Sequence, residues 1–406
     1  MEKMTVQEAA EKWGVTARRV QDLCKRGEIQ GAELWHRSWM IPQNAEYPTK
    51  AKKGEENLPM PKKSPFLNMT NLYTKAGTAD ECVKALAGNH EAQALFAAEI
   101  AYSRGEIDKV IEHTKEFLKS HSGFYAVNAG GMLLALAAMW KGDIALYRQA
   151  KVHICEAPCK HEEDEQIMAL SLACINSAVR DISNYPEWFR RGQFEHLHPD
   201  SHPAAKVFYI KYFIIAAQEH AKGAFELPDV SGMGLMRVIP YIAEPLIARV
   251  VSEKVVIPEI YLRLLVAVAY HQLGDDESAI VHIDKAIDLA LPDNLLGILV
   301  EHRRNFDNLL DDRLSLKDEK AFQRFKELHK QFLIGWTKLH NSLLSKNVSN
   351  ALTIRQREMC RLAAFGLSHK EIAARMNVEV SHVKKELFVV MNKTGALNRK
   401  ELGAYV

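Results

Sequence analysis

The sequence has no apolar run long enough to cross a bilayer and no glycine-rich loop that could hold a nucleotide phosphate. Its longest apolar run, Ala129–Trp140, is far shorter than the roughly 20 residues that a spanning helix needs. A G-x-x-x-x-G-K-[ST] motif is absent, so no ATP switch is expected. Charged residues at positions 2, 3, 8 and 11 interrupt any signal-peptide core. We expect a cytoplasmic protein that does not bind membranes.

Cysteine is scarce and scattered, with six residues in 406, which fits a reducing compartment. Cys155 and Cys159 lie near His161, but no second ligand pair follows, and a structural zinc site needs four ligands. Three histidines share a proline-broken loop: His196, His198 and His202. At both places ordinary loop residues are favoured over a metal site, and we expect no cofactor. No nucleophile motif is present, so we expect no enzymatic activity.

The formal net charge is only +2, which predicts no partner by itself. Its distribution is uneven. Residues 351–406 hold ten Lys or Arg and five Asp or Glu, and residues 1–50 hold eight and seven. Residues 64–350 hold 31 and 37. Basic ends on an acidic middle favour contact with DNA at the ends.

The C-terminal stretch Leu352–Arg399 has the start signals of short helices. Thr353 stands three residues before Gln356, and Ser368 three before Glu371, so each pair predicts a capping box. Apolar residues recur at helical spacing and predict a small core: Met359, Leu362, Ala363, Ile372, Ala373, Met376, Val383, Leu387, Val390 and Met391. We expect four short helices here.

The third of these helices has a basic face. Asn377-Val378 predicts a tight turn before it, because Asn tolerates the left-handed conformation, and Ser381 would cap it. Its polar face carries His382, Lys384, Lys385 and Lys393. Two short helices, a tight turn and a basic third helix are typical of units that place one helix in the major groove. A small helical bundle with a solvated basic face is the alternative.

This stretch resembles the LuxR-type DNA-binding domain. The matching residues are Leu352-Thr353, Arg355, Glu358, Gly366, Ser368, Lys370-Glu371-Ile372-Ala373, Val383-Lys384, Lys393, Gly395 and Asn398-Arg399. The resemblance implies double-stranded DNA as partner, contacted by residues of the recognition helix and the one before it: Ser381, His382, Lys384, Lys385, Lys393 and Lys370. It also implies a homodimer on DNA, paired through a last helix at about Arg399–Tyr405.

Three positions depart from the family pattern. Gln356 stands where the family usually has Glu, His369 where it has Asn, and Glu386 where it has His. Glu386 would lie on the DNA-facing side of the recognition helix. Because a carboxylate near phosphates is repulsive unless it accepts from a cytosine amino group, DNA binding is expected to be weak or unusually selective.

The segment Met4–Pro48 predicts a second helix-turn-helix. Thr5 and Glu8 form another capping-box pair, and Thr16 would cap a second helix that reaches Lys25. The two helices bury Val6, Ala9, Ala10, Trp13, Val20 and Leu23, and Gly14-Val15 and Gly27 provide their turns. The following residues, 29–41, alternate as two short strands, which would form a wing carrying His36 and Arg37.

This segment resembles the winged helix-turn-helix of the MerR and excisionase type. The matching residues are Thr5, Ala9-Ala10, Gly14-Val15, Arg18-Arg19-Val20, Gly27 and Ser38-Trp39-Met40-Ile41-Pro42. The resemblance implies DNA contacts from Thr16, Arg18, Arg19, Gln21 and Arg37. The alternative is a docking domain without DNA contact, which the nearly neutral charge of the segment supports.

The middle of the chain, Asn68–Leu344, predicts helices almost throughout. The clearest unit, Pro258–Pro292, pairs two helices across a Gly274-Asp275 turn, and weaker copies lie at Ala94–Leu118 and Leu133–Val152. These units are similar to tetratricopeptide (TPR) repeats at their small, aromatic and turn positions: Ala267, Tyr270, Gly274, Ala279, Ile283 and Ala286. A stack of such hairpins presents a groove for an unknown ligand or protein partner.

The order of these segments resembles the MalT-like regulators, in which a helical repeat sensor precedes a LuxR-type domain. We expect a mostly α protein with a winged helix-turn-helix at residues 1–47, a linker at 48–65, a TPR-like array at 66–345 and a LuxR-type four-helix unit at 346–406. The expected function is a bacterial transcriptional regulator whose array senses a ligand or protein. The alternative is a protein-interaction adaptor whose terminal domains only dock.

Overall fold

The computed structural model describes residues 3–25, 29, 31–35, 38–45, 73–120, 123–195, 197–221, 232–306, 308–345, 352–394, 396 and 398–405. Helices dominate these residues, which confirms the predicted mostly α class. The chain divides into two compact units, Met1–Leu58 and Pro59–Val406. The expected linker at 48–65 and the residues Gly27, His36 and Arg37 lie outside the described residues.

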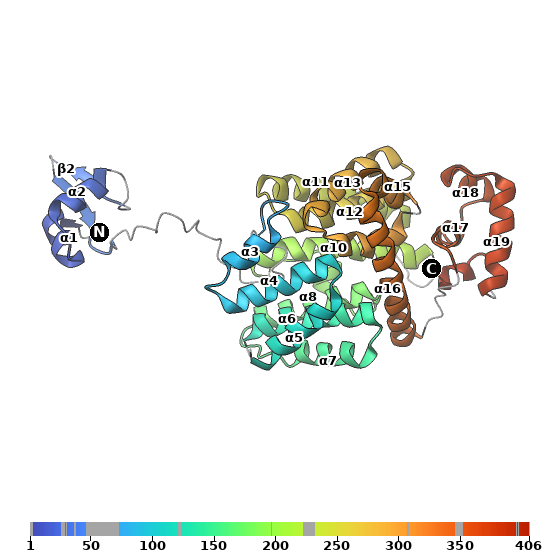
Figure 1. Cartoon of the computed structure of the whole chain (residues 1–406), viewed down its shortest axis with the longest axis horizontal. Coiled ribbons are helices and arrows are strands. Elements are labelled where there is room, and N and C mark those ends of the chain that lie inside the picture. The colour runs from blue at the N-terminus through green and yellow to red at the C-terminus, as the bar shows by residue number, and fades with distance from the viewer. Residues whose placement is uncertain are drawn as a thin grey trace. The chain divides into compact units, whose positions relative to one another are not determined.

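The N-terminal unit, in which Figure 1 labels α1, α2 and β2, packs two helices on a three-stranded antiparallel sheet. The strand order is β1-β3-β2. Its elements are β1 (Lys3–Thr5), α1 (Val6–Trp13), α2 (Ala17–Lys25), β2 (Glu33–Trp35) and β3 (Ser38–Pro42). Strands β2 and β3 are the two that the alternation predicts. Strand β1 was not expected, because three residues are too few to show alternation. It pairs Met4 with Ile41, and both side chains are buried.

The two helices of this unit begin and end where the sequence predicts. Thr5 and Glu8 form the capping box of α1, and the Thr16 hydroxyl accepts from the Arg19 amide at 3.4 Å at the start of α2. Gly14 ends α1 in the left-handed conformation, with φ of +65°, which lets the chain turn at once into α2.

A helical body begins the second unit. Its α-helices are α3 (Ala79–Ala85), α4 (His90–Arg104), α5 (Ile107–Ser120), α6 (Phe124–Lys141), α7 (Ile144–Cys155), α8 (Glu162–Ala178), α9 (Glu187–Arg190), α10 (His202–Ala221), α11 (Gly232–Ser252), α12 (Val256–Leu273), α13 (Asp276–Ala290), α14 (Leu296–His302), α15 (Leu309–Lys317) and α16 (Glu319–Leu344). Short 3-10 turns are η2 (Pro199–Ser201), η3 (Leu291–Asp293) and η4 (Arg303–Asn305). Between residues 73 and 345, the described residues include no strand.

The three helix pairs predicted from the sequence are present as α4–α5, α6–α7 and α12–α13. Each pair turns at a left-handed glycine: Gly105, Gly142 and Gly274. Helix α12 is buried on nearly all sides, because α10, α11, α13 and α14 pack against it.

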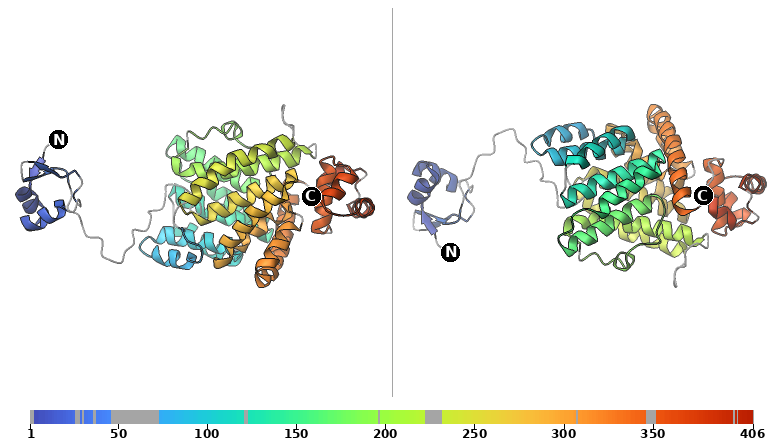
Figure 2. Two further views of the ribbon diagram at one scale, coloured as in Figure 1. Left: turned by 90° about the horizontal axis from the view of Figure 1, so that it is seen from above. Right: turned by 90° about the horizontal axis from the view of Figure 1, so that it is seen from below.

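The body also differs from an open stack of hairpins. Helix α16 packs on α6, and α14 packs on α4, so late helices close onto early ones (Figure 2). A Cβ atom built on Gly335 would lie 1.8 Å from the Trp140 carbonyl oxygen, so α16 and α6 are in backbone contact there. One hydrophobic core therefore runs through the body from Tyr73 to Leu339.

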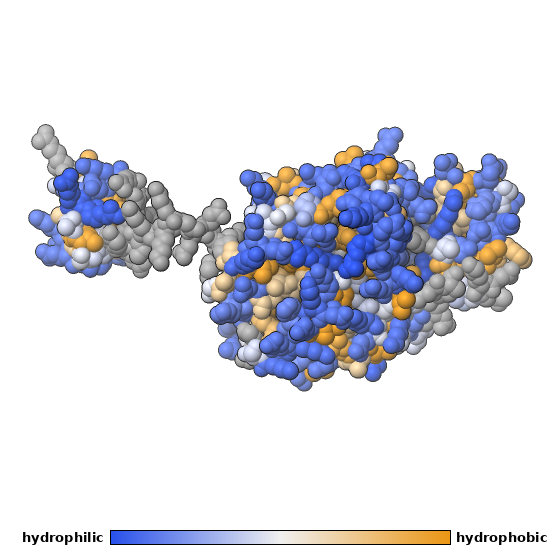
Figure 3. All heavy atoms as spheres, in the orientation of Figure 1, coloured by the Kyte–Doolittle hydropathy of each residue, from blue (hydrophilic) through white to orange (hydrophobic). Residues whose placement is uncertain are grey.

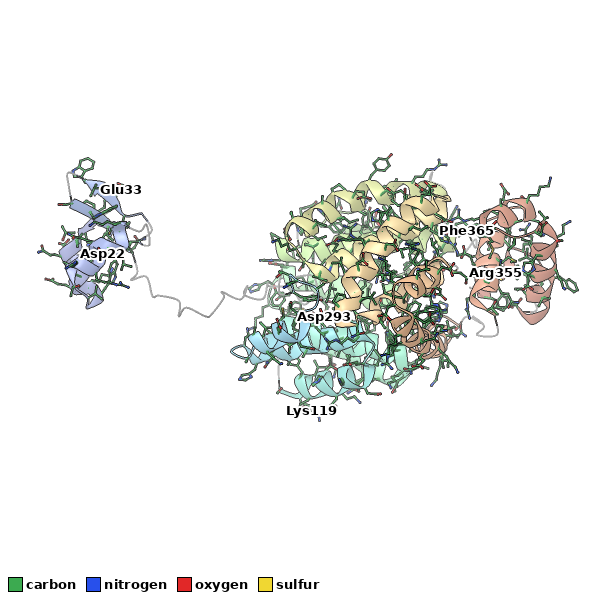
Figure 4. All side chains as sticks on the ribbon, turned by 45° about the horizontal axis from the view of Figure 1, so that its top comes forward. Asp22, Glu33, Lys119, Asp293, Arg355 and Phe365 are labelled. Atoms are coloured by element: carbon green, nitrogen blue, oxygen red, sulfur yellow. The ribbon has the colours of Figure 1, made fainter. Side chains whose placement is uncertain are left out.

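Asp293 ties the start of the body to η3 (Figure 4). Its carboxylate accepts hydrogen bonds from the Tyr73 hydroxyl and from the backbone amides of Gly77 at 2.5 Å and Ala79 at 3.2 Å. Three donors compensate a carboxylate that is almost wholly buried. The chain entering α3 is thus joined to residues more than 200 positions later.

The C-terminal helices are α17 (Ile354–Ala364), α18 (His369–Arg375) and α19 (Val380–Thr394), followed by the 3-10 helix η5 (Glu401–Tyr405). Both predicted capping boxes are present, and the predicted core residues are buried, Met391 partly. One expectation was wrong, because Ser381 lies inside α19, which begins one residue earlier. The last predicted helix is present as the 3-10 helix η5.

Among the described residues, no helix is both long and apolar enough to cross a membrane. On the face shown in Figure 3, hydrophilic side chains cover most of the surface, and apolar residues are scattered among them. Side chains such as Lys119 point outward into solvent (Figure 4).

Candidate nucleic-acid interface

Helix α19 is held by the short helix before it. The Ser368 hydroxyl accepts from the Glu371 amide at 3.3 Å, which starts α18, and Asn377 turns the chain with φ of +50°. Ile372 of α18 and Val383 of α19 are both fully buried between the two helices. The buried side of α19 is therefore determined, and its opposite side is left to solvent.

That opposite side carries a stripe of exposed residues, which we call the α19 stripe: Ser381, Lys384, Lys385 and Phe388. Residues three and four positions apart share one face of a helix, so these side chains form one surface. His382 is partly buried at its edge. Lys370, at the start of α18, is exposed, whereas the side chain of Lys393 lies outside the described ones.

Phe388 is the residue that sequence analysis missed. Its side chain is 65% exposed, although apolar residues of α19 generally face the core. The signal was available, because Phe388 follows Lys384 by four residues and so lies on the same face. An exposed aromatic ring beside two lysines combines an apolar contact for thymine methyl groups with charge for phosphates.

Gln356 and Glu386 connect α17 to the flank of α19. The Gln356 amide nitrogen donates to the Glu386 carboxylate at 2.9 Å, and its oxygen accepts from the Thr353 backbone amide at 3.1 Å. Glu386 is partly buried and lies beside the α19 stripe, not within it. Two of the three departures from the LuxR pattern are thus direct neighbours.

In the N-terminal unit, the residues expected to contact DNA differ in how far they are exposed. Thr16, Arg18 and Gln21 are exposed, and Arg19 is partly buried. Arg37 lies outside the described residues. On strand β2, the Leu34 side chain is 61% exposed and the Trp35 side chain 66%. The sequence pattern predicted a strand here but did not predict this exposure.

No family model matches this chain, and neither does any curated protein or solved structure. Its function is therefore inferred from its residues and their geometry. Where the structure describes them, no three His, Cys, Asp or Glu side chains lie close enough to hold a metal ion together. Cys155 and Cys159 are exposed and free, and Cys24, Cys174 and Cys360 are buried.

A partly open cavity lies in the helical body, and none of its lining residues belongs to α19. Helices α6, α8, α10, α12, α14 and α16 and the turn η4 line it. Its polar lining includes Arg180, Lys211, Gln218, Glu301, Arg304 and Asn305. An adjoining cavity shares Arg180 and Arg304 and reaches Arg357, Glu358 and Arg361 of α17. The body therefore offers a partly open space that continues to α17.

Proposed function

We propose that this chain is a DNA-binding transcriptional regulator of the bacterial cytoplasm, in which α19 enters the major groove. The observation that carries this proposal is the α19 stripe, an exposed surface of two lysines, a serine and an aromatic ring on a helix fixed by its opposite face. The short helix α18 and the turn at Asn377 precede it in the order typical of a helix-turn-helix.

The charges of this surface suit DNA. Lys384 and Lys385 are exposed, and Lys370 at the start of α18 adds a third cation. Lysines that neutralise phosphates release counterions, which makes the affinity depend strongly on salt. The Glu386 carboxylate opposes this attraction, but its bond to Gln356 directs one oxygen toward α17. We infer selective rather than tight binding.

The other parts of the chain have subordinate roles in this proposal. The N-terminal unit would be a second DNA reader of the winged type, through Thr16, Arg18 and Gln21 on its exposed side. Two chains would pair through the residues around η5. The helical body would act as a TPR-like sensor whose ligand changes DNA occupancy by linkage.

The test is binding of the full-length protein to fragments of its own upstream DNA across a salt series. Lys384→Ala should weaken binding to all sequences and lower the slope of log affinity against log salt by about one. Lys320→Ala, an exposed lysine on α16, is the matched control. An unchanged slope for Lys384→Ala would show that α19 does not bind phosphate.

Deletions separate the two ends. Removing residues 346–406 should abolish specific binding, and removing residues 1–47 should weaken it and lower the salt slope. If only the first deletion matters, the N-terminal unit is not a DNA reader. The DNA affinity of each deletion variant is compared with that of the full-length chain in the same buffer.

A second candidate function is a protein-interaction adaptor. It is favoured by the exposed Leu34 and Trp35 of β2, because exposed apolar residues often mark protein contacts. The adaptor proposal expects weak, sequence-independent DNA binding and salt-insensitive binding to a protein. Leu34→Ser with Trp35→Ser would then remove the protein contact and leave DNA affinity unchanged.

A further inference from the structure

The cavity in the helical body is small and partly charged. It leaves about 80 Å³ for the centres of water-sized molecules. Since one water needs at least about 10–15 Å³ by this measure, the cavity has room for several waters or one small organic molecule. Met139, Ile214 and Phe332 make part of its wall apolar, and Arg180, Lys211 and Arg304 supply cations.

Two of these cations have carboxylate neighbours. The Arg180 guanidinium donates to Glu219 at 3.0 Å and 3.3 Å, which makes a nearly buried ion pair. The Lys211 ammonium lies 3.8 Å from Glu301, at the limit of an ion pair, and 5.1 Å from the centre of the Tyr261 ring. Glu301 also accepts from the Tyr102 hydroxyl at 2.6 Å. These carboxylates are therefore already engaged.

Arg304 makes no comparably close contact with a carboxylate. Its guanidinium lies 4.2 Å from the centre of the Trp336 ring, and within the described part of the chain it makes neither a hydrogen bond nor an ion pair. Desolvation, with the charges of Arg180 and Arg357, holds the pKa of this guanidinium well below its usual range. Glu219 is a nearby counter-charge, but its carboxylate pairs with Arg180. A partly buried cation with no ion pair of its own is costly, and a bound anion would offset that cost.

We propose that this cavity binds a small organic anion whose carboxylate or phosphate group is held by Arg304. The guanidinium presents several N–H donors in a planar fork, which matches either group. The Trp336 ring lies against the guanidinium, with 4.2 Å between Arg304 Cζ and the ring centre, and supports it from one side. The apolar wall would contact the carbon part of the ligand, which distinguishes an organic anion from inorganic phosphate.

The site also offers a route to regulation, which rests on the proposed function. Arg304 and Arg180 line the adjoining cavity that Arg357 and Arg361 of α17 complete. Arg361 pairs with Glu358, and burial lowers the pKa of Arg357. An anion on Arg304 would reduce the repulsion between Arg304 and Arg357 and stabilise the packing of α17 on the body. By reciprocity, DNA would change the affinity for the anion by the same factor that the anion changes the affinity for DNA.

The experiment measures thermal unfolding and calorimetric binding of the full-length protein with glycerol 3-phosphate, succinate and inorganic phosphate. Ionic strength is matched with sodium chloride, and DNA is absent. At saturation, one of the two organic anions should raise the midpoint temperature by roughly 2–5 °C, and more than inorganic phosphate does. The comparison distinguishes a phosphate ester from a carboxylate.

The decisive variant is Arg304→Met, whose side chain can still contact the Trp336 ring but carries no charge. Without ligand it should unfold at a higher temperature than the wild type, and it should bind the anion at least about tenfold more weakly. Arg324→Met, an exposed arginine on α16, should behave as the wild type. Equal stabilisation of Arg304→Met and wild type by the anion would overturn the proposal, as would no anion effect on the wild type.

Arg304→Lys keeps the charge but not the planar fork, and should retain part of the affinity for the anion. This variant serves as the test if Arg304→Met does not fold. DNA binding is then measured separately. A protein that binds the anion but no specific DNA would contradict the proposed regulator and leave the anion site standing. A protein that binds specific DNA but no anion would contradict the anion site and leave the proposed regulator standing.

Discussion

Gln356 of α17 donates a hydrogen bond to Glu386 of α19 at 2.9 Å, and these are two of the positions at which the chain departs from the LuxR pattern. In that pattern a carboxylate occupies the first position and an imidazole the second. Here an amide faces a carboxylate. Each residue provides what the other needs, a donor for an acceptor.

The pair predicts a double-mutant result. Gln356→Glu would place two carboxylates in contact in a partly buried site, and should lower the free energy of unfolding by about 1–3 kcal/mol at pH 7. Urea denaturation measures this change. Adding Glu386→Gln should restore most of the loss, since the bond then forms in the opposite direction. Additive losses in the double variant would show that the pair is not coupled.

Phe388 predicts a change in specificity without a change in stability. Its ring is 65% exposed, so Phe388→Ser should alter the free energy of unfolding by less than about 0.5 kcal/mol. Affinity for the specific fragment should fall by about 1–3 kcal/mol if the ring contacts a thymine methyl group. Replacing each thymine of the site by uracil, which lacks the methyl group, should reproduce the loss at one position. Leu316→Ser, at a position 74% exposed on α15, is the control.

Two buried histidines predict loss of stability in acid. Burial, aided by nearby cations, lowers the pKa of His302 to about 3 and that of His329 to about 3. The unfolded chain, with a pKa near 6.5, binds the proton more readily. The free energy of unfolding therefore does not depend on these two histidines above about pH 6.5. As the pH falls from 6.5 toward 3, each of them lowers the free energy of unfolding by up to about 1.4 kcal/mol per pH unit.

Denaturation by urea at several pH values measures this slope. His329→Gln should flatten it by up to about 1.4 kcal/mol per pH unit between pH 6 and 4. The exposed His90→Gln should leave the slope of the wild type unchanged. If His329→Gln also leaves it unchanged, another group governs the acid transition.

Gly335 lies where α16 packs closely against α6, so its substitution tests this contact. Because a Cβ atom would lie 1.8 Å from the Trp140 carbonyl oxygen, Gly335→Ala must force α16 away from α6. We expect a loss of about 3 kcal/mol or more in the free energy of unfolding, by urea denaturation. Gly88→Ala meets nothing within 4 Å and should be neutral or slightly stabilising. A neutral Gly335→Ala would mean that the two helices do not touch.

Most local features of the candidate interface could be predicted from the sequence. The capping boxes at Thr353 and Ser368 and the turn at Asn377 depend on residues within a few positions of one another. Ser381 was misplaced because a serine near a helix start resembles a cap, whereas α19 begins at Val380. The exposure of Phe388 was missed because an apolar residue was assumed to face the core.

The sequence by itself determined the mostly α class, the helix pairs around Gly105, Gly142 and Gly274, and the buried face of α19, since these follow from capping, turns and periodicity along a short stretch. Only the tertiary structure decided the rest. The closure of α16 on α6, the bond between Gln356 and Glu386, and the meeting of Arg180, Lys211 and Arg304 in one cavity each join residues far apart in the chain. Such contacts depend on which helices pack together, and helical periodicity carries no information about that choice.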